Sequence, residues 1–162
     1  MAELNQIARL DPLTELYNRR GFEVHMAECM LHWQQQSHPF GLINVDVNHF
    51  KAVNDQYGHA AGDLVLQKIA AYLKNVVSDR GEVARWGGDE FLILVKQDNN
   101  QDLVTISEQL QDDRESLVIK INEQSITIQF SVGSALVEEN DTLESLLHRA
   151  DSAMYAAKFS HQ

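Results

Sequence analysis

Two apolar segments joined by a pair of glycines constrain the fold more than any other feature of the chain. The segments "EVARW" (82–86) and "EFLILV" (90–95) are rich in β-branched, aromatic and aliphatic residues, and Gly87-Gly88 lies between them. Two such segments separated by a Gly-Gly turn are typical of a β-hairpin. We therefore expect at least part of the core to be built on an antiparallel sheet.

The rest of the chain alternates between helical and extended patterns. Apolar residues recur at helical spacing in several segments, while others are short continuous apolar runs. We expect helices over 19–36, 49–56, 60–77, 101–115 and 142–158, a buried strand over 40–47, and a second hairpin formed by 117–121 and 126–137 around residues 122–124. Strands interleaved with helices predict an α+β fold, with a ferredoxin-like, mixed antiparallel central sheet flanked by helices.

Length and charge narrow the classes of function. The 162 residues suit one domain and are enough to bury a substantial core. A formal charge of -11 repels nucleic-acid backbones and anionic membranes, so we expect neither as a partner, whereas metal ions still allow small phosphate ligands to bind. One cysteine, Cys29, cannot form an internal disulfide, and no apolar run is long enough to cross a membrane. We therefore expect a cytoplasmic protein.

Three carboxylates lie where predicted strands end or begin. Asp46 ends the first predicted strand, and Asp89 and Glu90 lead into a later one. If these strands are neighbours, the like charges meet at one edge and destabilise the fold unless a cation joins them. Oxygen ligands completed by substrate phosphate suit Mg²⁺, and Gly87 and Gly88 would let a phosphate approach the backbone. The alternative is a solvated hairpin tip, and these residues alone favour neither.

Two further polar residues have the chemistry needed to recognise guanine. The amide of Asn54 can satisfy O6 or N3 of the base, and the carboxylate of Asp63 can accept from N1–H and N2–H₂. Each residue also has a structural explanation, which is the commoner one for that residue taken alone. Asn54 would then be a turn residue, and Asp63 would cap a helix N-terminus or interact favourably with the helix dipole there.

Four motifs together resemble a known family. "RWGGDEF", "DPLTELYNRRGF", "VDVNHFKAVNDQYGHAAGD" and "RADSAMYAAK" are similar to the GGDEF domain family, the diguanylate cyclases, in order and spacing from Asp11 to Lys158. The resemblance implies a fold like the palm of polymerases and nucleotide cyclases. It also implies that two GTP molecules are joined into cyclic di-GMP, with release of pyrophosphate. We expect this domain over 11–162, with 1–10 as the end of a linker helix.

The resemblance assigns roles to individual residues. It implies two Mg²⁺ ions per active site, with Mn²⁺ as a substitute, bound by Asp46, the carbonyl of Val47, Asp89 and Glu90. Asp89 is also the candidate acceptor of the ribose 3′-hydroxyl proton, although a metal-bound carboxylate is a weak base. The resemblance also places Lys51 and Lys158 at the phosphates, and Lys51 is counted with the catalytic groups. Asn54 and Asp63 would contact guanine, and His59 would lie near the nucleotide. Gly87 and Gly88 would lie beside the phosphates. The structural alternatives are solvated amines for the lysines and a helix-start hydrogen bond for His59.

The reaction implied by the resemblance requires two copies of the chain. One site holds one GTP, so two 3′-to-5′ linkages require two sites facing each other in an antiparallel homodimer. Family members usually carry an upstream sensor domain, and we expect none within this chain. The alternative function is a catalytically silent module that binds GTP or acts as a dimerising regulator.

Several positions depart from the family pattern. Ser78 and Gly81 stand where many members have the Arg and Asp of an Arg-x-x-Asp product-inhibition site, so we expect no tight product inhibition. Gln162 replaces an arginine that would help to hold the phosphates. Asn48 replaces a frequently acidic residue, and Glu15 stands where glycine is usual.

Overall fold

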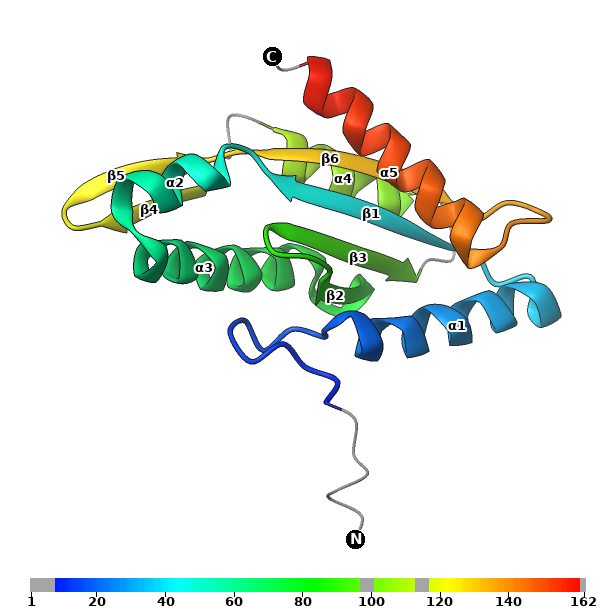
Figure 1. The fold of residues 1–162 in the computed structure, drawn as a ribbon. Helices are drawn as coiled ribbons and strands as arrows, with labels where there is room; N and C mark the ends of the chain where they lie inside the picture. The colour runs from blue at the N-terminus through cyan, green and yellow to red at the C-terminus, as the bar shows by residue number, and fades with distance from the viewer. Residues whose placement is uncertain (1–7, 97–100, 113–116, 161–162) are drawn as a thin grey trace, which may run out of the picture.

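The computed structural model of the protein describes residues 8–96, 101–112 and 117–160 (Figure 1). Its helices are α1 (Arg19–Gln36), α2 (Phe50–Tyr57), α3 (His59–Val77), α4 (Gln101–Gln111) and α5 (Leu143–Ser160), and a short 3₁₀ turn covers Ser78–Arg80. Its strands are β1 (Phe40–Val47), β2 (Gly81–Arg85), β3 (Glu90–Lys96), β4 (Leu117–Ile121), β5 (Gln124–Ile128) and β6 (Phe130–Leu136).

The predicted secondary structure is confirmed except at a few ends and in the last predicted strand, which is divided in two. The helix expected over 101–115 stops at Gln111, and residues 113–116 lie outside the described part of the chain. Most of the linker helix predicted over 1–10 also lies outside the described residues, which start at residue 8. Residues 8–10 are not helical, and Leu10 instead forms an isolated bridge with Tyr17.

The central sheet has the strand order β2-β3-β1-β6, and every neighbouring pair is antiparallel. The chain runs from β1 through helices to the β2–β3 hairpin, and then through α4 and the β4–β5 pair to β6. This is the split βαβ arrangement of ferredoxin-like folds. The predicted α+β class with helices flanking an antiparallel sheet is therefore confirmed.

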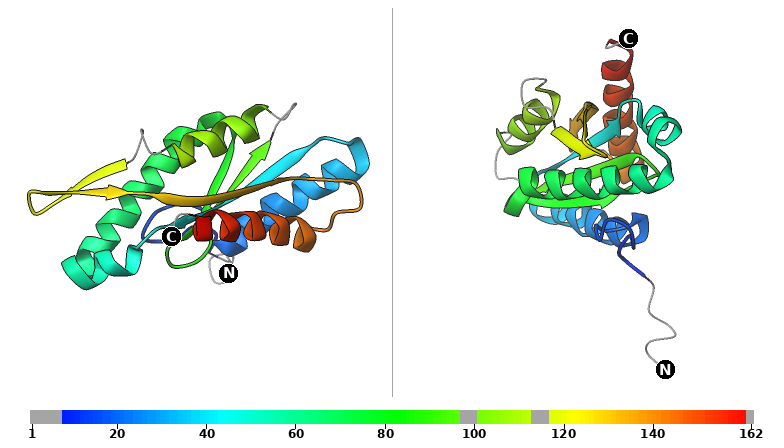
Figure 2. Two further views of the ribbon diagram at one scale, coloured as in Figure 1. Left: turned by 90° about the horizontal axis from the view of Figure 1, so that it is seen from above. Right: turned by 90° about the vertical axis from the view of Figure 1, so that its left-hand side faces the viewer.

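The second predicted hairpin belongs to a separate sheet. Among the described residues, its strands β4 and β5 pair only with each other, through a two-residue turn at Asn122 and Glu123 in which both residues have positive φ. The single strand expected over 126–137 is divided at Gln129, and its second half, β6, pairs with β1. The β4–β5 hairpin projects beyond the central sheet (Figure 2). Both halves are apolar, so the composition gives no sign of the division.

Two apolar layers cover the two faces of the central sheet. On one face, Ile43 and Val45 of β1 pack in a cluster that includes buried residues of α3 and α4. On the other face, Phe40 and Leu42 pack in a cluster that includes residues of α1 and α5. Because both faces are covered, all eight residues of β1 are buried, including the polar residues Asn44 and Asp46.

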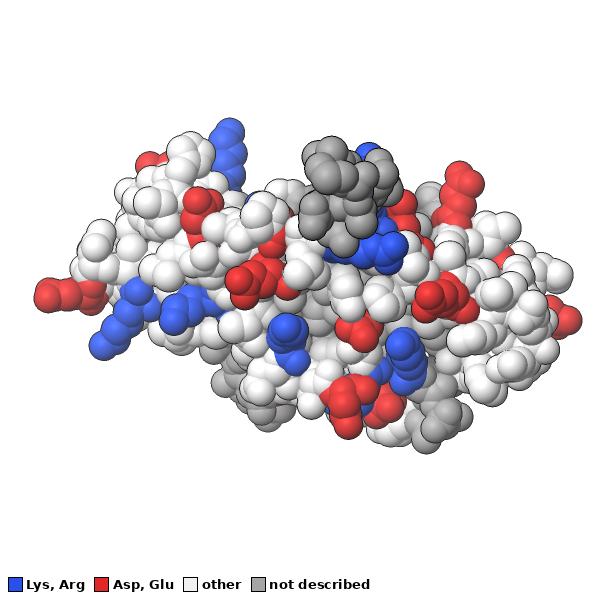
Figure 3. Space-filling view, turned by 90° about the horizontal axis from the view of Figure 1, so that it is seen from below, with Lys and Arg blue, Asp and Glu red and all other residues white. Residues whose placement is uncertain are grey.

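The described part of the chain contains no helix that is both long and apolar enough to span a membrane. Lys and Arg side chains are interspersed with Asp and Glu over the face seen from below (Figure 3). The described residues of that face therefore carry both signs of charge side by side.

Glu15 occupies a backbone conformation that favours glycine. Its φ is 61°, in the left-handed region, where a side chain costs about 1–2 kcal/mol. We expect Glu15→Gly to stabilise the fold by about 1 kcal/mol, because the removed strain exceeds the added entropy of the unfolded chain. For a protein of this size, the melting temperature should rise by about 2–4 °C in a calorimetric scan.

A matched change at a helical position separates this effect from a general effect of removing a glutamate. Glu108 is exposed within α4, where glycine is unfavourable, so Glu108→Gly should lower the melting temperature. A lower melting temperature for Glu15→Gly as well would contradict the argument from backbone strain.

Candidate functional site

The register of β1 against β3 brings the acidic residues together. Asp46 lies directly opposite Glu90 in the antiparallel ladder, and Asp89 immediately precedes Glu90. The amide of Val47 donates to the carbonyl of Asp89 over 3.2 Å, so the end of β1 holds the backbone of the hairpin. The three carboxylates therefore lie together along the edge of the central sheet where β1 ends and β3 begins.

The electrostatics of this edge are unfavourable for the carboxylates alone. Burial raises the pKa of Asp89 above its ordinary value, and the nearby charge of Asp46 raises it further. Burial also raises the pKa of Glu90, to which Asp46, Asp151 and Asp89 add repulsion. Desolvation and like charges both disfavour the ionised forms, so a positive charge at this edge would stabilise them.

Lys158 of α5 supplies one positive charge. Its Nζ donates to Oδ2 of Asp46 over 2.6 Å, and the Asp46 residue is only 8% exposed. This hydrogen bond raises the pKa of Lys158, which therefore stays protonated. The predicted phosphate ligand thus lies against a predicted metal ligand, although 112 residues separate the two.

The glycine turn is held by its neighbours on both sides. The amides of Trp86 and Gly87 donate to the carbonyl of Glu90 over 2.8 and 3.1 Å. The guanidinium of Arg85 donates to the carbonyl of Gly88 over 3.1 and 2.9 Å. A Cβ added at Gly88 would meet no atom within 4 Å, so the backbone there is open to a ligand.

Arg85 also connects the turn to the N-terminal loop. Its Nη1 lies 3.3 Å from Oδ1 of Asp11 in a largely buried ion pair. Burial alone would raise the pKa of Asp11, but hydrogen bonds from Thr14 and the charge of Arg85 outweigh it and leave the pKa below its ordinary value. The sequence did not predict the contact between Arg85 and Asp11, because the two residues are 74 positions apart.

The residues predicted to recognise guanine lie on the α2–α3 pair. Asn54 is within α2 rather than in a turn, and Asp63 is an exposed residue of α3, inside the helix rather than at its cap. The N-cap of α3 is Gly58, without a side-chain cap, and His59 is the exposed first residue of the helix. Asn54 is therefore not a turn residue, and Asp63 is not the N-cap of α3.

These side chains are unengaged within the described residues. There, none of Lys51, Asn54, His59 and Asp63 makes a side-chain hydrogen bond or an ion pair. Lys51 is exposed on α2, which follows directly from the end of β1. Their polar atoms are therefore available to a ligand.

Two further residues beside the site, Asn44 and Asp151, were also not predicted from the sequence. Asn44 is 5% exposed, and its Nδ2 donates to Oδ1 of Asp151 over 3.0 Å. A side-chain hydrogen bond from Asn44 also lowers the pKa of Glu90, against the larger effect of burial. Together with the ion pair between Asp46 and Lys158, this contact anchors α5 to β1 at two points. The one feature of the sequence that could have indicated this role is the amide of Asn44 within an otherwise largely apolar strand.

The donor set at the sheet edge fits a hard divalent cation. Asp46, Asp89 and Glu90 offer only oxygen atoms, which Mg²⁺ prefers over the nitrogen and sulfur donors that select zinc. Within the described residues, no three His, Cys, Asp or Glu side chains are already arranged as a metal centre. Mg²⁺ usually takes one or two protein carboxylates and completes its shell with phosphate oxygens and water, so such a centre is not required.

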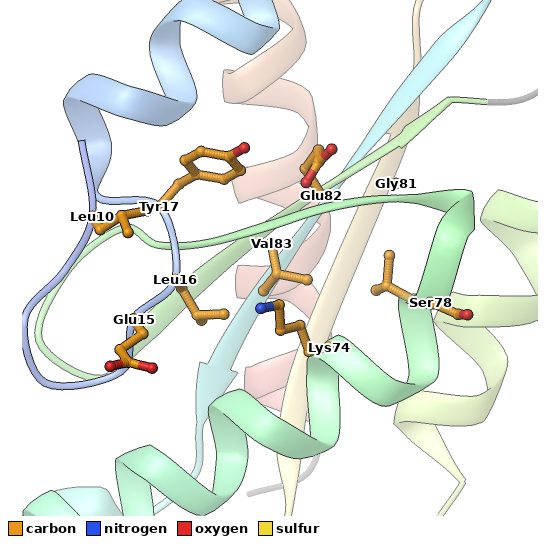
Figure 4. Close-up of a pocket in the computed structure, with 10 residues that line it drawn as sticks. Leu10, Glu15, Leu16, Tyr17, Lys74, Ser78, Gly81, Glu82 and Val83 are labelled. Atoms are coloured by element: carbon orange, nitrogen blue, oxygen red, sulfur yellow. The ribbon is translucent and has the colours of Figure 1, made fainter.

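The positions of the Arg-x-x-Asp motif lie beside a separate cavity. This cavity of about 280 Å³ is bounded by α3, the start of β2 and the N-terminal loop, and Lys74 and Val83 contribute to its wall (Figure 4). A Cβ added at Gly81 would lie 1.9 Å from the carbonyl oxygen of Leu94, so β3 blocks any side chain there. Arg80, between the two motif positions Ser78 and Gly81, donates to carbonyls in the last turn of α3.

Of the other departures from the family pattern, Asn48 lies close to the carboxylates, two residues after Asp46. Asn48 accepts a hydrogen bond from the hydroxyl of Ser131 over 2.7 Å, so its side chain is already engaged. Gln162 lies outside the described residues.

Comparison with known proteins gives consistent matches. The family described as "Diguanylate cyclase, GGDEF domain" matches residues 8–162. Diguanylate cyclase VdcA of Vibrio cholerae serotype O1 is 36% identical over 163 residues, which cover 98% of this chain and 46% of VdcA. The chain therefore spans about half the length of that relative.

Solved structures share the fold. Diguanylate cyclase SiaD of Pseudomonas aeruginosa, solved in complex with its activator SiaC, aligns with a TM-score of 0.87 at 33% identity, over 98% of this chain and 61% of SiaD. The GGDEF domain of DgcB from Caulobacter crescentus, solved in complex with c-di-GMP, aligns with a TM-score of 0.86 at 27% identity, over 98% and 92%.

Proposed function

Because the chain belongs to the GGDEF domain family, we propose that it is a diguanylate cyclase that condenses two GTP into cyclic di-GMP and releases two pyrophosphates. The observation that carries the proposal is the pairing of Asp46 with Glu90, beside Asp89, at the open edge of the sheet. A silent regulatory module would not need to keep three carboxylates in this unfavourable arrangement.

The carboxylate edge is the proposed reaction centre. Asp46, the carbonyl of Val47, Asp89 and Glu90 would hold two Mg²⁺ ions, or Mn²⁺ in their place, which supply charge stabilisation to the attacking and leaving oxygens. Lys158 holds the carboxylate of Asp46 in place through its short ion pair. Asp89, immediately before β3, is the candidate acceptor of the 3′-hydroxyl proton.

The remaining groups would bind the nucleotide. Gly87 and Gly88 present an open backbone turn to the phosphates, and the exposed amine of Lys51 would neutralise charge there. Asn54 and Asp63 would recognise the guanine edge, with His59 nearby at the start of α3. Within the described residues their side chains make no hydrogen bond or ion pair, so these groups can bind a base. We place this reaction in the cytoplasm, where the buried thiol of Cys29 remains reduced.

The proposal requires a homodimer, and this requirement provides its test. Each chain offers one carboxylate edge, so two GTP molecules must meet across two copies. We expect the rate per protein molecule to rise with protein concentration when GTP and Mg²⁺ are saturating, as measured by chromatography of the product. GTP binding without any cyclic di-GMP at any concentration would instead support a silent module.

Product inhibition through the Arg-x-x-Asp positions is expected to be absent. Ser78 offers no guanidinium, and β3 excludes an acidic side chain at position 81. Initial rates should therefore change by less than about twofold when cyclic di-GMP is added at low micromolar concentration, where a site lacking its bidentate arginine binds weakly. Strong inhibition at that concentration would contradict this expectation.

A further inference from the structure

We propose that Gly62 is a specificity-positioning residue: its missing side chain leaves the space in which the amide of Asn54 lies, and this fixes the amide relative to Asp63. The inference rests on the proposed function, because it concerns how the chain recognises guanine. It assigns no contact between Gly62 and the nucleotide.

The geometry around Gly62 is tight on one side only. A Cβ added there would lie 1.8 Å from Oδ1 and 2.9 Å from Cγ of Asn54, and 3.4 Å from Cζ of Phe50. Ordinary contacts between heavy atoms are about 3.5–4.0 Å. An alanine methyl and the present position of the Asn54 amide are therefore mutually exclusive, whereas Phe50 needs little or no adjustment.

The backbone does not require glycine at this position. Gly58 is the one glycine with positive φ among the described residues, whereas Gly62 is buried within α3. Glycine is less favourable than alanine in a helix interior. Glycine at position 62 therefore makes α3 less stable than alanine would. The amide of Asn54 occupies the space that an alanine methyl would fill.

The α2–α3 connection leaves the side chain of Asn54 as the part that can move. The carbonyl of Asn54 accepts from the amide of Gly58 over 2.8 Å, and the carbonyl of Gly58 accepts from the amide of Gly62 over 3.1 Å. These bonds hold the backbones of both helices. A methyl at position 62 would consequently be accommodated by rotation of the Asn54 amide, not by separation of the helices.

Such a rotation would affect base recognition specifically. Asp63 follows Gly62 directly on α3, so the backbone of Gly62 sets the spacing between the carboxylate and the amide. Recognition by two groups requires both to be held close to the productive geometry. Rotating the amide removes its hydrogen bond to O6 or N3 of guanine, while the phosphate-binding groups keep their positions.

The test is the Gly62→Ala variant assayed with GTP. We expect KM to rise about tenfold, which corresponds to the loss of a hydrogen bond of about 1.4 kcal/mol, with kcat within about twofold. Inhibition by inorganic pyrophosphate, which has no base, should be unchanged. The melting temperature should not fall, so a loss of folding cannot account for the change in KM.

A double-mutant cycle separates positioning from a general effect on α3. In an Asn54→Ala background, Gly62→Ala should change KM by less than about twofold, because the amide that it displaces is gone. Leu64→Ala, a partly exposed change on the same helix, should leave KM unchanged. An unchanged KM in Gly62→Ala, or a tenfold effect that persists without Asn54, would overturn the inference.

The proposed function can fail separately from this inference. Wild-type protein that neither binds GTP nor forms cyclic di-GMP would overturn both. Wild-type turnover with a raised KM in Asn54→Ala, but none in Gly62→Ala, would overturn only the positioning role of the glycine.

Discussion

Replacing Asp89 by alanine is expected to abolish cyclic di-GMP formation, with a fall in rate of about 10³-fold or more, as for the loss of a main electrostatic contact to a transition state. Asp89 immediately precedes β3, the strand opposite β1, and the amide of Val47 donates to its carbonyl. The change removes one of the carboxylates that would hold the metal ions and also the candidate proton acceptor. The measurement is product formation from GTP and Mg²⁺ at several protein concentrations.

The fold should survive this change. Burial and the charge of Asp46 raise the pKa of Asp89, which means that its ionised form costs stability at neutral pH. Removing the carboxylate relieves that cost, so the melting temperature should not fall. Asp79→Ala, an exposed change in the 3₁₀ turn, is the matched control and should keep wild-type turnover. Retained turnover in Asp89→Ala would count heavily against the metal assignment.

The largest loss of stability is expected from Gly133→Ala. A Cβ there would lie 1.9 Å from the amide nitrogen of Met154 and 2.5 Å from the carbonyl oxygen of Ala150. Both are backbone atoms of α5, so no side-chain rotation can relieve the overlap and the helix must move. We expect a loss of about 3 kcal/mol, and a melting temperature lower by about 6–12 °C in a thermal scan.

Gly133→Ala should also reduce activity, because α5 carries Lys158 to Asp46 and Asp151 to Asn44. The matched control for stability is Gly88→Ala, where an added Cβ meets nothing within 4 Å. Its melting temperature should stay within about 1 °C of the wild-type value. Equal melting temperatures for the two variants would show that α5 does not rest on Gly133 as closely as described.

The local elements were predictable because their causes are local. Periodicity identified the helices, and Gly87-Gly88 identified the β2–β3 hairpin, since each pattern depends on residues a few positions apart. The position of Asp46 at the end of a buried strand was predictable for the same reason. The division between β5 and β6 was not, because an apolar run carries no information on which strand it pairs with.

The proposed roles of the site residues remain predictions, but the contacts around them illustrate a general limit. Arg85 holds the turn through Gly88, Asn44 holds Asp151, and Gly62 leaves room for Asn54. In a sequence, these residues read as a surface arginine, an isolated amide and a helix-weakening glycine. Their partners become visible only when helices and strands are packed against one another.

The sequence by itself determined the elements, their order, the family and the residue types available for chemistry, because propensity, periodicity and motif spacing are written along the chain. The tertiary structure decided which of these residues meet. Strand register set Asp46 opposite Glu90, and the packing of α5 brought Lys158 to Asp46 across 112 positions. Such contacts depend on the three-dimensional path of the backbone, since each side chain reaches only a few ångströms from it.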